Sequence, residues 1–371
     1  MRFTHLRAAL HPIPSALLRE LRAVQLLGPS AADALRPVLS VLLAVGAATL
    51  LQLDDLVWAA FGGYMVMRRD IGELMRRAVH RIAGTIGGAV IGLILAPAIA
   101  DSGLALSVAL FATVWIGTLG TLTTRYGYAW LFFGLTAGMV ETEALAAPEM
   151  IVHFAATRVA EVVLGTIACV IVGSLFSRPA DIARVTSPVS SSIDLRGALR
   201  YEWLREHWLI LEHTTRIALA VALLPSIWRC FEIESFLQTA VTAYVVMLVP
   251  SAMVRGRRHQ TIYERIAHRI LGCLLGSIAA LTSIALFGEA LLPALLTLCV
   301  GVWLGYQVQN GREGVSYLGT QFTLGLLTTL VQGSGPISSI APGLMRLLGI
   351  VIGSVALCVL TCLWPLADDN S

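Results

Sequence analysis

Long apolar segments separated by short polar turns constrain this chain more than any other feature. A membrane-spanning helix needs about 20 apolar residues, and only 13% of the 371 residues are charged, against about 25% in soluble domains. The pattern predicts an all-α, polytopic helical membrane protein with about 12 transmembrane helices. The lipid bilayer is therefore an expected partner of the protein. The segments are 38–53, 56–67, 82–100, 103–122, 127–147, 151–176, 214–230, 234–254, 266–287, 290–309, 315–332 and 343–366.

The first two segments are short, and only Asp54 and Asp55 separate them. We expect either two short tilted helices or helices that neighbouring helices cover.

Basic residues gather on one side of the expected membrane. When the loops alternate between sides, 23 of the 26 arginines fall on the same side. Because arginine-rich loops remain in the cytoplasm, both termini are expected there. These arginines lie in the N-terminal arm, loop 68–81, Arg125, linker 177–213, Arg216, loop 255–269 and Arg312, whereas the opposite side carries Asp54, Asp55, Asp101, Glu141, Glu143, Glu149, Glu232, Glu234 and Glu289.

One phrase occurs twice. Residues 78–88 read AVHRIAGTIGG, and 188 positions later residues 266–276 read IAHRILGCLLG. Both copies follow an arginine-rich segment, so they lie on the same side and predict two parallel six-helix repeats, related by an axis along the membrane normal. The predicted organisation is a cytoplasmic amphipathic arm (1–34), a first repeat (35–178), a basic cytoplasmic linker (179–213), a second repeat (214–366) and a cytoplasmic tail (367–371).

The repeated phrase has two interpretations. The glycines at 84, 88 and 92, and at 272 and 276, form stripes on which helices pack closely in lipid. Alternatively, the basic pairs contact an anion at the inner mouth of a pathway. The residues of these pairs are His80 with Arg81 and His268 with Arg269.

Two basic amphipathic stretches, 15–27 and 195–213, are expected as helices that lie on the inner membrane surface near anionic headgroups.

Arg158 and Glu161 lie inside the run 150–176. A charge at the centre of a membrane helix costs about 2.5–3.5 kcal/mol, so we expect such residues to take part in substrate or proton movement. Arg158 and Arg346, which match between the repeats, would bind a carboxylate substrate, and Glu161 would exchange a proton. The alternatives are arginines that reach the interface and a structural salt bridge. Tyr64 and Tyr244 would stack on an aromatic substrate or anchor helices at the interface.

Catalytic and cofactor motifs do not stand out. The chain has no lysine, which excludes a Walker A loop, and its six cysteines lie in or beside apolar runs, as small hydrophobes do. We expect no enzyme, no catalytic residue, no cofactor and no metal site, and no nucleic-acid partner because the arginines are spread over membrane loops.

The order of elements resembles the membrane repeat of the fusaric acid resistance and aromatic acid exporter family. The matching positions are Trp58-Ala59, Met67, His80-Arg81, Gly84-Thr85 and Gly88, followed by TRVAEVVLGTIACVIVGSLFSRP. The resemblance covers about 35–180 well and 214–366 more loosely. It implies a bacterial inner-membrane efflux protein for aromatic or other organic acids, with a periplasmic adaptor protein as partner. Long family members carry a sizeable soluble domain, whereas here about 35 residues join the repeats.

These observations favour a secondary transporter that exports small, aromatic carboxylic acids with the proton gradient. The alternatives are a passive organic-anion channel and a non-transporting membrane subunit of an envelope complex. The sequence is compatible with a transport pathway inside one chain. It is equally compatible with a homodimer in which each chain lines part of the pathway.

Overall fold

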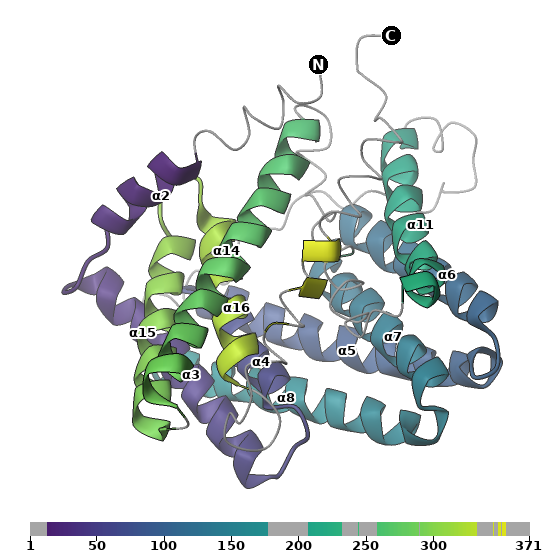
Figure 1. Ribbon diagram of the computed structural model, residues 1–371, viewed down its shortest axis with the longest axis horizontal. Coiled ribbons are helices and arrows are strands. Elements are labelled where there is room, and N and C mark those ends of the chain that lie inside the picture. The colour runs from purple at the N-terminus through teal and green to yellow at the C-terminus, as the bar shows by residue number, and fades with distance from the viewer. Residues whose placement is uncertain are drawn as a thin grey trace.

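The computed structural model describes residues 13–176, 207–231, 244, 258–288, 290–331, 344, 348–349 and 351–353. Every regular element in these ranges is a helix (Figure 1), so the all-α prediction is confirmed for them. The elements are α2 (Ile13–Arg22), α3 (Pro29–Leu50), α4 (Leu56–Met65), α5 (Ile71–Ile99), α6 (Gly103–Thr123), α7 (Gly127–Ala146), the 3-10 turn η1 (Pro148–Met150), α8 (Ile151–Leu175), α11 (Trp208–Phe231), α14 (Arg258–Phe287), α15 (Leu291–Gln309) and α16 (Ser316–Leu330).

Seven helices in the described part of the chain are long and apolar enough to cross a membrane: α3, α5, α6, α8 with η1, α11, α14 and α15. A polytopic membrane protein is therefore supported, with fewer such helices than the expected twelve. The short α4, α7 and the 15-residue α16 are not among the seven. The segment expected at 234–254, and most of the one at 343–366, lie outside the described residues.

The arginine-rich segment expected as a loop at 68–81 is mostly helix. Asp70 caps the start of α5, because its side chain accepts a hydrogen bond from Glu73 N at 2.7 Å. Arg77 then pairs with Glu73 one turn away, at 3.0 Å. The same correction applies to the segment 255–269, because α14 begins at Arg258. The repeated His-Arg pairs consequently lie within helices.

The glycine stripes are packing seams, as the sequence predicts. A side chain at Gly84 or Gly88 would overlap backbone oxygens of α7, and one at Gly92 would lie 2.7 Å from Val140. In the second half, Gly272 and Gly276 face α16 in the same way. The seams hold α5 against α7 and α14 against α16, and each brings the arginine one turn earlier close to the partner helix.

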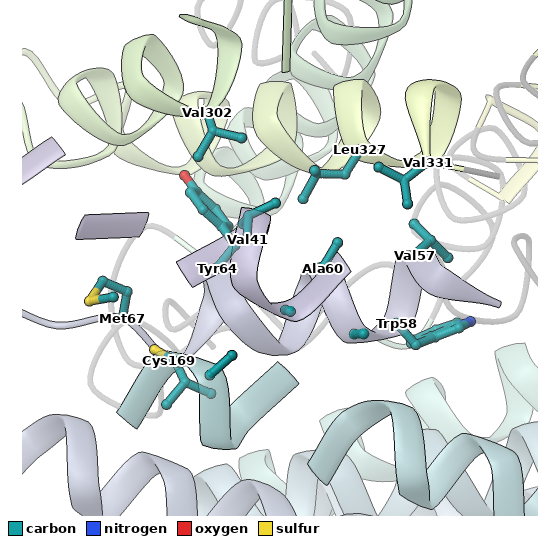
Figure 2. Packing of buried hydrophobic residues seen from close by; sticks show 14 of the residues in the cluster. Val41, Val57, Trp58, Ala60, Tyr64, Met67, Cys169, Val302, Leu327 and Val331 are labelled. Atoms are coloured by element: carbon teal, nitrogen blue, oxygen red, sulfur yellow. The ribbon is translucent and has the colours of Figure 1, made fainter. Parts of the chain in front are cut away.

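The ten-residue α4 is about 15 Å long and cannot cross a bilayer alone. It is buried among its neighbours, as one of the two sequence interpretations expects. Figure 2 shows Val57 and Ala60 facing α16, with Cys169 of α8 on the opposite side of α4. α4 and α8 are so close that a side chain at Gly165 would overlap the carbonyl oxygen of Ala59.

Helices from the two halves of the chain pack on one another. α3 lies against α15, and α11 lies against α6 (Figure 1). Trp303 Nε1 of α15 donates a hydrogen bond to Ala31 O of α3 at 3.0 Å, and Trp115 Nε1 of α6 donates to Thr215 Oγ1 of α11 at 3.2 Å. The first helix of each half therefore packs on the other half.

Helix α2 also contacts the second half. Ile13 and Ala16 share a buried cluster with residues of α14, α16 and the loop before α16. Glu20, 7% exposed, accepts hydrogen bonds from the backbone N–H groups of Arg312 and Glu313 at 3.0 and 2.9 Å. One face of the segment expected on the membrane surface is thus docked on protein. The other expected surface helix, 195–213, lies largely outside the described residues.

Candidate functional site

A pocket opens between the two halves, with a volume of about 80 Å³. Its walls differ. The first half supplies mainly apolar and aromatic side chains from α4, α5 and α7, and the second half supplies most of the polar groups, from α14 and α16. Each half contributes one arginine. The described lining residues are Trp58, Phe61, Met65, Arg81, Leu131, Phe132, Leu135, Arg269, Cys273, Gln321, Leu324, Gly325 and Thr328.

Arg81 enters the pocket from α5 and is 1% exposed. Its guanidinium lies over the ring of Phe132, 4.2 Å from the centroid, and Nη1 is 3.7 Å from Met65 Sδ. Within the described residues, no carboxylate pairs with Arg81, and its Nε has no hydrogen-bond partner. A buried cation without an anionic partner is costly, so this pocket is suited to an anion.

Arg269 enters the same pocket from α14 and is 5% exposed. Its Nη1 donates a hydrogen bond to Gln321 Oε1 of α16 at 2.8 Å. Cys273 Sγ, one turn further along α14, lies 3.6 Å from the same oxygen. The second arginine is therefore oriented by a neutral amide.

The pocket pairs cationic groups with aromatic surface. Trp58 and Phe61 meet edge to face, with centroids 5.5 Å apart. A guanidinium binds a carboxylate through two parallel hydrogen bonds, and aromatic rings prefer edge-to-face or offset contacts with another ring. Such a lining fits a small molecule with a ring and a negative charge. The described residues include no cluster of three His, Cys, Asp or Glu side chains that could hold a metal ion.

Arg158 and Glu161 form a separate, buried ion pair at the start of α4. Arg158 Nη1 is 3.0 Å from Glu161 Oε2 and 3.8 Å from Asp55 Oδ2, and its guanidinium lies 4.5 Å from the Trp58 ring centroid. Glu161 Oε1 accepts a hydrogen bond from Asp55 N at 2.8 Å. The pair ties α8 to the first turn of α4. Only Trp58 is shared with the pocket.

The two tyrosines lie at contacts between the halves, outside the described pocket lining. Tyr64 of α4 donates a hydrogen bond to Gln309 Oε1 at 2.6 Å and accepts one from Thr323 Oγ1 at 3.1 Å. Tyr244 places its hydroxyl against Gly117 of α6 and Gly134 of α7.

The other expected contacts are distributed differently. His80 meets Tyr126 edge to face with centroids 5.4 Å apart, and it does not line the described pocket. His268 is 8% exposed and is also outside the lining. Arg346 lies outside the described residues. Of the expected anion contacts, Arg81 and Arg269 are therefore the two that meet in one pocket.

Some lining residues had no role in the sequence interpretation. Phe132, Phe61 and Gln321 lie in apolar runs without any distinguishing pattern. Trp58 is part of the family motif, which gives it no role in binding. A weak signal existed for Gln321, because an amide side chain in a membrane helix needs a partner.

Comparisons with known proteins agree with the membrane fold. The model of the Fusaric acid resistance protein family matches residues 32–209, which run from α3 to the start of α11. No curated protein and no solved structure matches the chain. The resemblance to the fusaric acid resistance protein family, a family of membrane transport and resistance proteins, is thus confirmed over residues 32–209.

Proposed function

We propose that this protein is a secondary transporter that exports small aromatic carboxylic acids, driven by the proton gradient across the bacterial inner membrane. The observation that carries the proposal is the pocket between the halves, where Arg81 and Arg269 meet Trp58, Phe61 and Phe132. The arginines would bind the carboxylate and the aromatic wall would hold the ring.

We further infer that the chain consists of two parallel repeats. Ile71 begins α5 and Arg258 begins α14, within one residue of the sequence offset of 188. Pro29 and Trp208, which begin α3 and α11, are within one residue of the offset of 180 that relates Arg36 to Arg216 before the basic segment. The reciprocal contacts of α3 with α15 and of α11 with α6 support the same relation. In such an arrangement Arg81 and Arg269 are equivalent, and both termini are cytoplasmic.

Another assignment of the substrate site is Arg158 with Arg346, with Glu161 as the proton-exchanging group. The contacts of Arg158 favour a different role, because Glu161 and Asp55 already surround its guanidinium. We therefore place the carboxylate at Arg81 and Arg269 and assign Arg158 to holding α4.

Counterflow tests the proposal. Purified protein in lipid vesicles is loaded with unlabelled hydroxybenzoate, and entry of labelled hydroxybenzoate is followed. Arg81→Gln and Arg269→Gln are compared with wild type, and Arg76→Gln is the matched control because Arg76 is exposed on the same helix as Arg81. We expect saturable counterflow in wild type and control. Loss of one charged hydrogen bond costs about 1.5–3 kcal/mol, which corresponds to about tenfold or more in affinity.

Three outcomes contradict the proposal. Folded Arg81→Gln and Arg269→Gln proteins with wild-type counterflow would remove the pocket as the anion site. Conductance without counterflow would identify an anion channel. Neither activity, for a panel of aromatic acids, would favour the non-transporting subunit.

A further inference from the structure

A second buried ionisable group lies away from the pocket. Glu141 sits within α7, five residues before its end and inside the expected span 127–147. It is 0% exposed and surrounded by apolar residues of α6 and α7, among them Leu110, Val140 and Ala144. Neither the anion site nor the Arg158–Glu161 pair uses it.

The hydrogen bonds of Glu141 fit a protonated carboxyl. Thr113 Oγ1 of α6 lies 3.1 Å from Glu141 Oε2 and 2.9 Å from Ala109 O. A hydroxyl has a single hydrogen and donates it to one acceptor at a time. A neutral Glu141 satisfies both contacts, because it donates to Thr113 while Thr113 donates to Ala109. Its other oxygen, Oε1, has no hydrogen-bond partner within the described residues.

Charges on the helices around α7 do not compensate an ionised Glu141. Among the described elements, α5, α6, α8 and η1 make the main contacts with α7, and Tyr244 also lies against it. α6 carries no charged residue, and the last on α5 is Arg81, in the pocket. On α8, Arg158 is paired with Glu161 and Asp55. The remaining charged groups are His153 of α8, which pairs with Asp54, and the acidic Glu149 of η1. An isolated carboxylate in such surroundings is unstable.

The buried carboxyl at this position is a feature of the first half alone. At the equivalent position of the proposed second repeat, α16 has Thr329. Its hydroxyl is within hydrogen-bond distance of Gly325 O at 2.9 Å and Ser277 Oγ at 3.1 Å. The threonine contacts α14, whereas Glu141 contacts α6, so the two proposed repeats do not share a carboxyl at this position.

We propose that Glu141 binds and releases the coupling proton of transport. In this proposal, the arrangement with Thr113 Oγ1 at 3.1 Å is the one in which the carboxyl holds its proton. Once water from the cytoplasmic side reaches the carboxyl, the O–H bond breaks and the proton passes to that water. The carboxylate is later protonated from the opposite side. This inference rests on the proposed proton-driven export.

Accumulation of substrate against its gradient requires proton coupling, whereas counterflow requires only substrate binding and exchange. Measuring both in one variant therefore tells the two apart. Vesicles with a lumen more acidic than the bath receive labelled hydroxybenzoate from outside, so that entry is exchanged for protons that leave. Passive partition of a weak acid favours the alkaline side, so accumulation in the acidic lumen requires the protein. We expect Glu141→Gln to abolish this accumulation and to keep counterflow. Glu143→Gln, two residues along the same helix, is the matched control and should keep both.

The outcomes distinguish this inference from the proposed function. Accumulation by Glu141→Gln at the wild-type level would overturn the role of Glu141 while export stands. Absence of counterflow in wild type would overturn export itself. An infrared measurement at neutral pH adds a readout independent of transport: a carboxylic-acid band present in wild type and in Glu143→Gln should disappear in Glu141→Gln. If Glu141→Gln does not fold, Glu141→Asp replaces it, and an unchanged pH dependence of uphill transport in that variant contradicts the inference.

Discussion

At the scale of single residues, two buried arginines differ in whether a carboxylate lies beside the guanidinium. Arg158 faces Glu161 and Asp55, whereas Arg81 faces aromatic surface and a pocket. Sequence reasoning could find Arg158 because it interrupts a long apolar run. It could not find the burial of Arg81, because an arginine that ends a basic segment looks exposed until the start of the helix is known.

The ion pair gives a stability prediction. Arg158→Ala leaves Glu161 buried without its cation, and removal of one member of a buried pair costs about 3–5 kcal/mol. The double variant Arg158→Met with Glu161→Met should recover most of that loss, because apolar side chains then fill the site. Thermal unfolding in detergent measures both. A fully stable Arg158→Ala protein that no longer transports would instead return Arg158 to the substrate site.

At the scale of elements, the contact between α5 and α7 depends on glycine spacing. That spacing is visible in the sequence, and the seam is confirmed. The identity of the partner helix is not visible, because Gly84 and Gly88 meet backbone atoms that carry no sequence signal. The same seam sets the distance between Arg81 and Phe132, so it also shapes the pocket.

Adjacent glycines on α5 provide a matched test of the seam. A side chain at Gly88 would overlap Phe133 O, whereas one at Gly87 would lie 3.6 Å from Phe133 Cδ2, an ordinary contact. We expect Gly88→Ala to destabilise the protein by about 1–3 kcal/mol. Gly87→Ala should be neutral or stabilising by up to about 1 kcal/mol, since alanine favours helix. Equal unfolding temperatures for the two variants would show that the seam is looser than described.

At the scale of the whole molecule, each half of the chain packs its first helix on the other half. α3 contacts α15 and α11 contacts α6. The sequence offsets predict two similar halves, and they carry no information about this crossing, because the contacts join residues far apart in the chain. The sequence offers Arg81 and Arg269 as anion contacts, but it could not show that they line one pocket, because they are 188 positions apart and on different helices.

Because each half packs its first helix on the other half, we expect the two halves to form a stable complex when they are separate chains. Residues 1–192 and 193–371, expressed together as separate chains, should associate and purify as one complex, because α3 and α11 each bury a face on the other half. A tag on one fragment and detection of the other measure this association. Independent folding of the two fragments without association would contradict the described arrangement.

Equilibrium binding tests the central claim that the pocket between the two halves binds a carboxylate selectively. Calorimetry on the purified protein compares hydroxybenzoate with hydroxybenzamide, which has a similar shape and no charge. Wild type and the exposed-residue control Arg76→Gln should prefer the acid by about tenfold or more, as expected for a charged hydrogen bond. Arg81→Gln and Arg269→Gln should each lose most of that preference and keep weak binding of the amide. An unchanged preference for the acid in folded Arg81→Gln and Arg269→Gln would contradict the account.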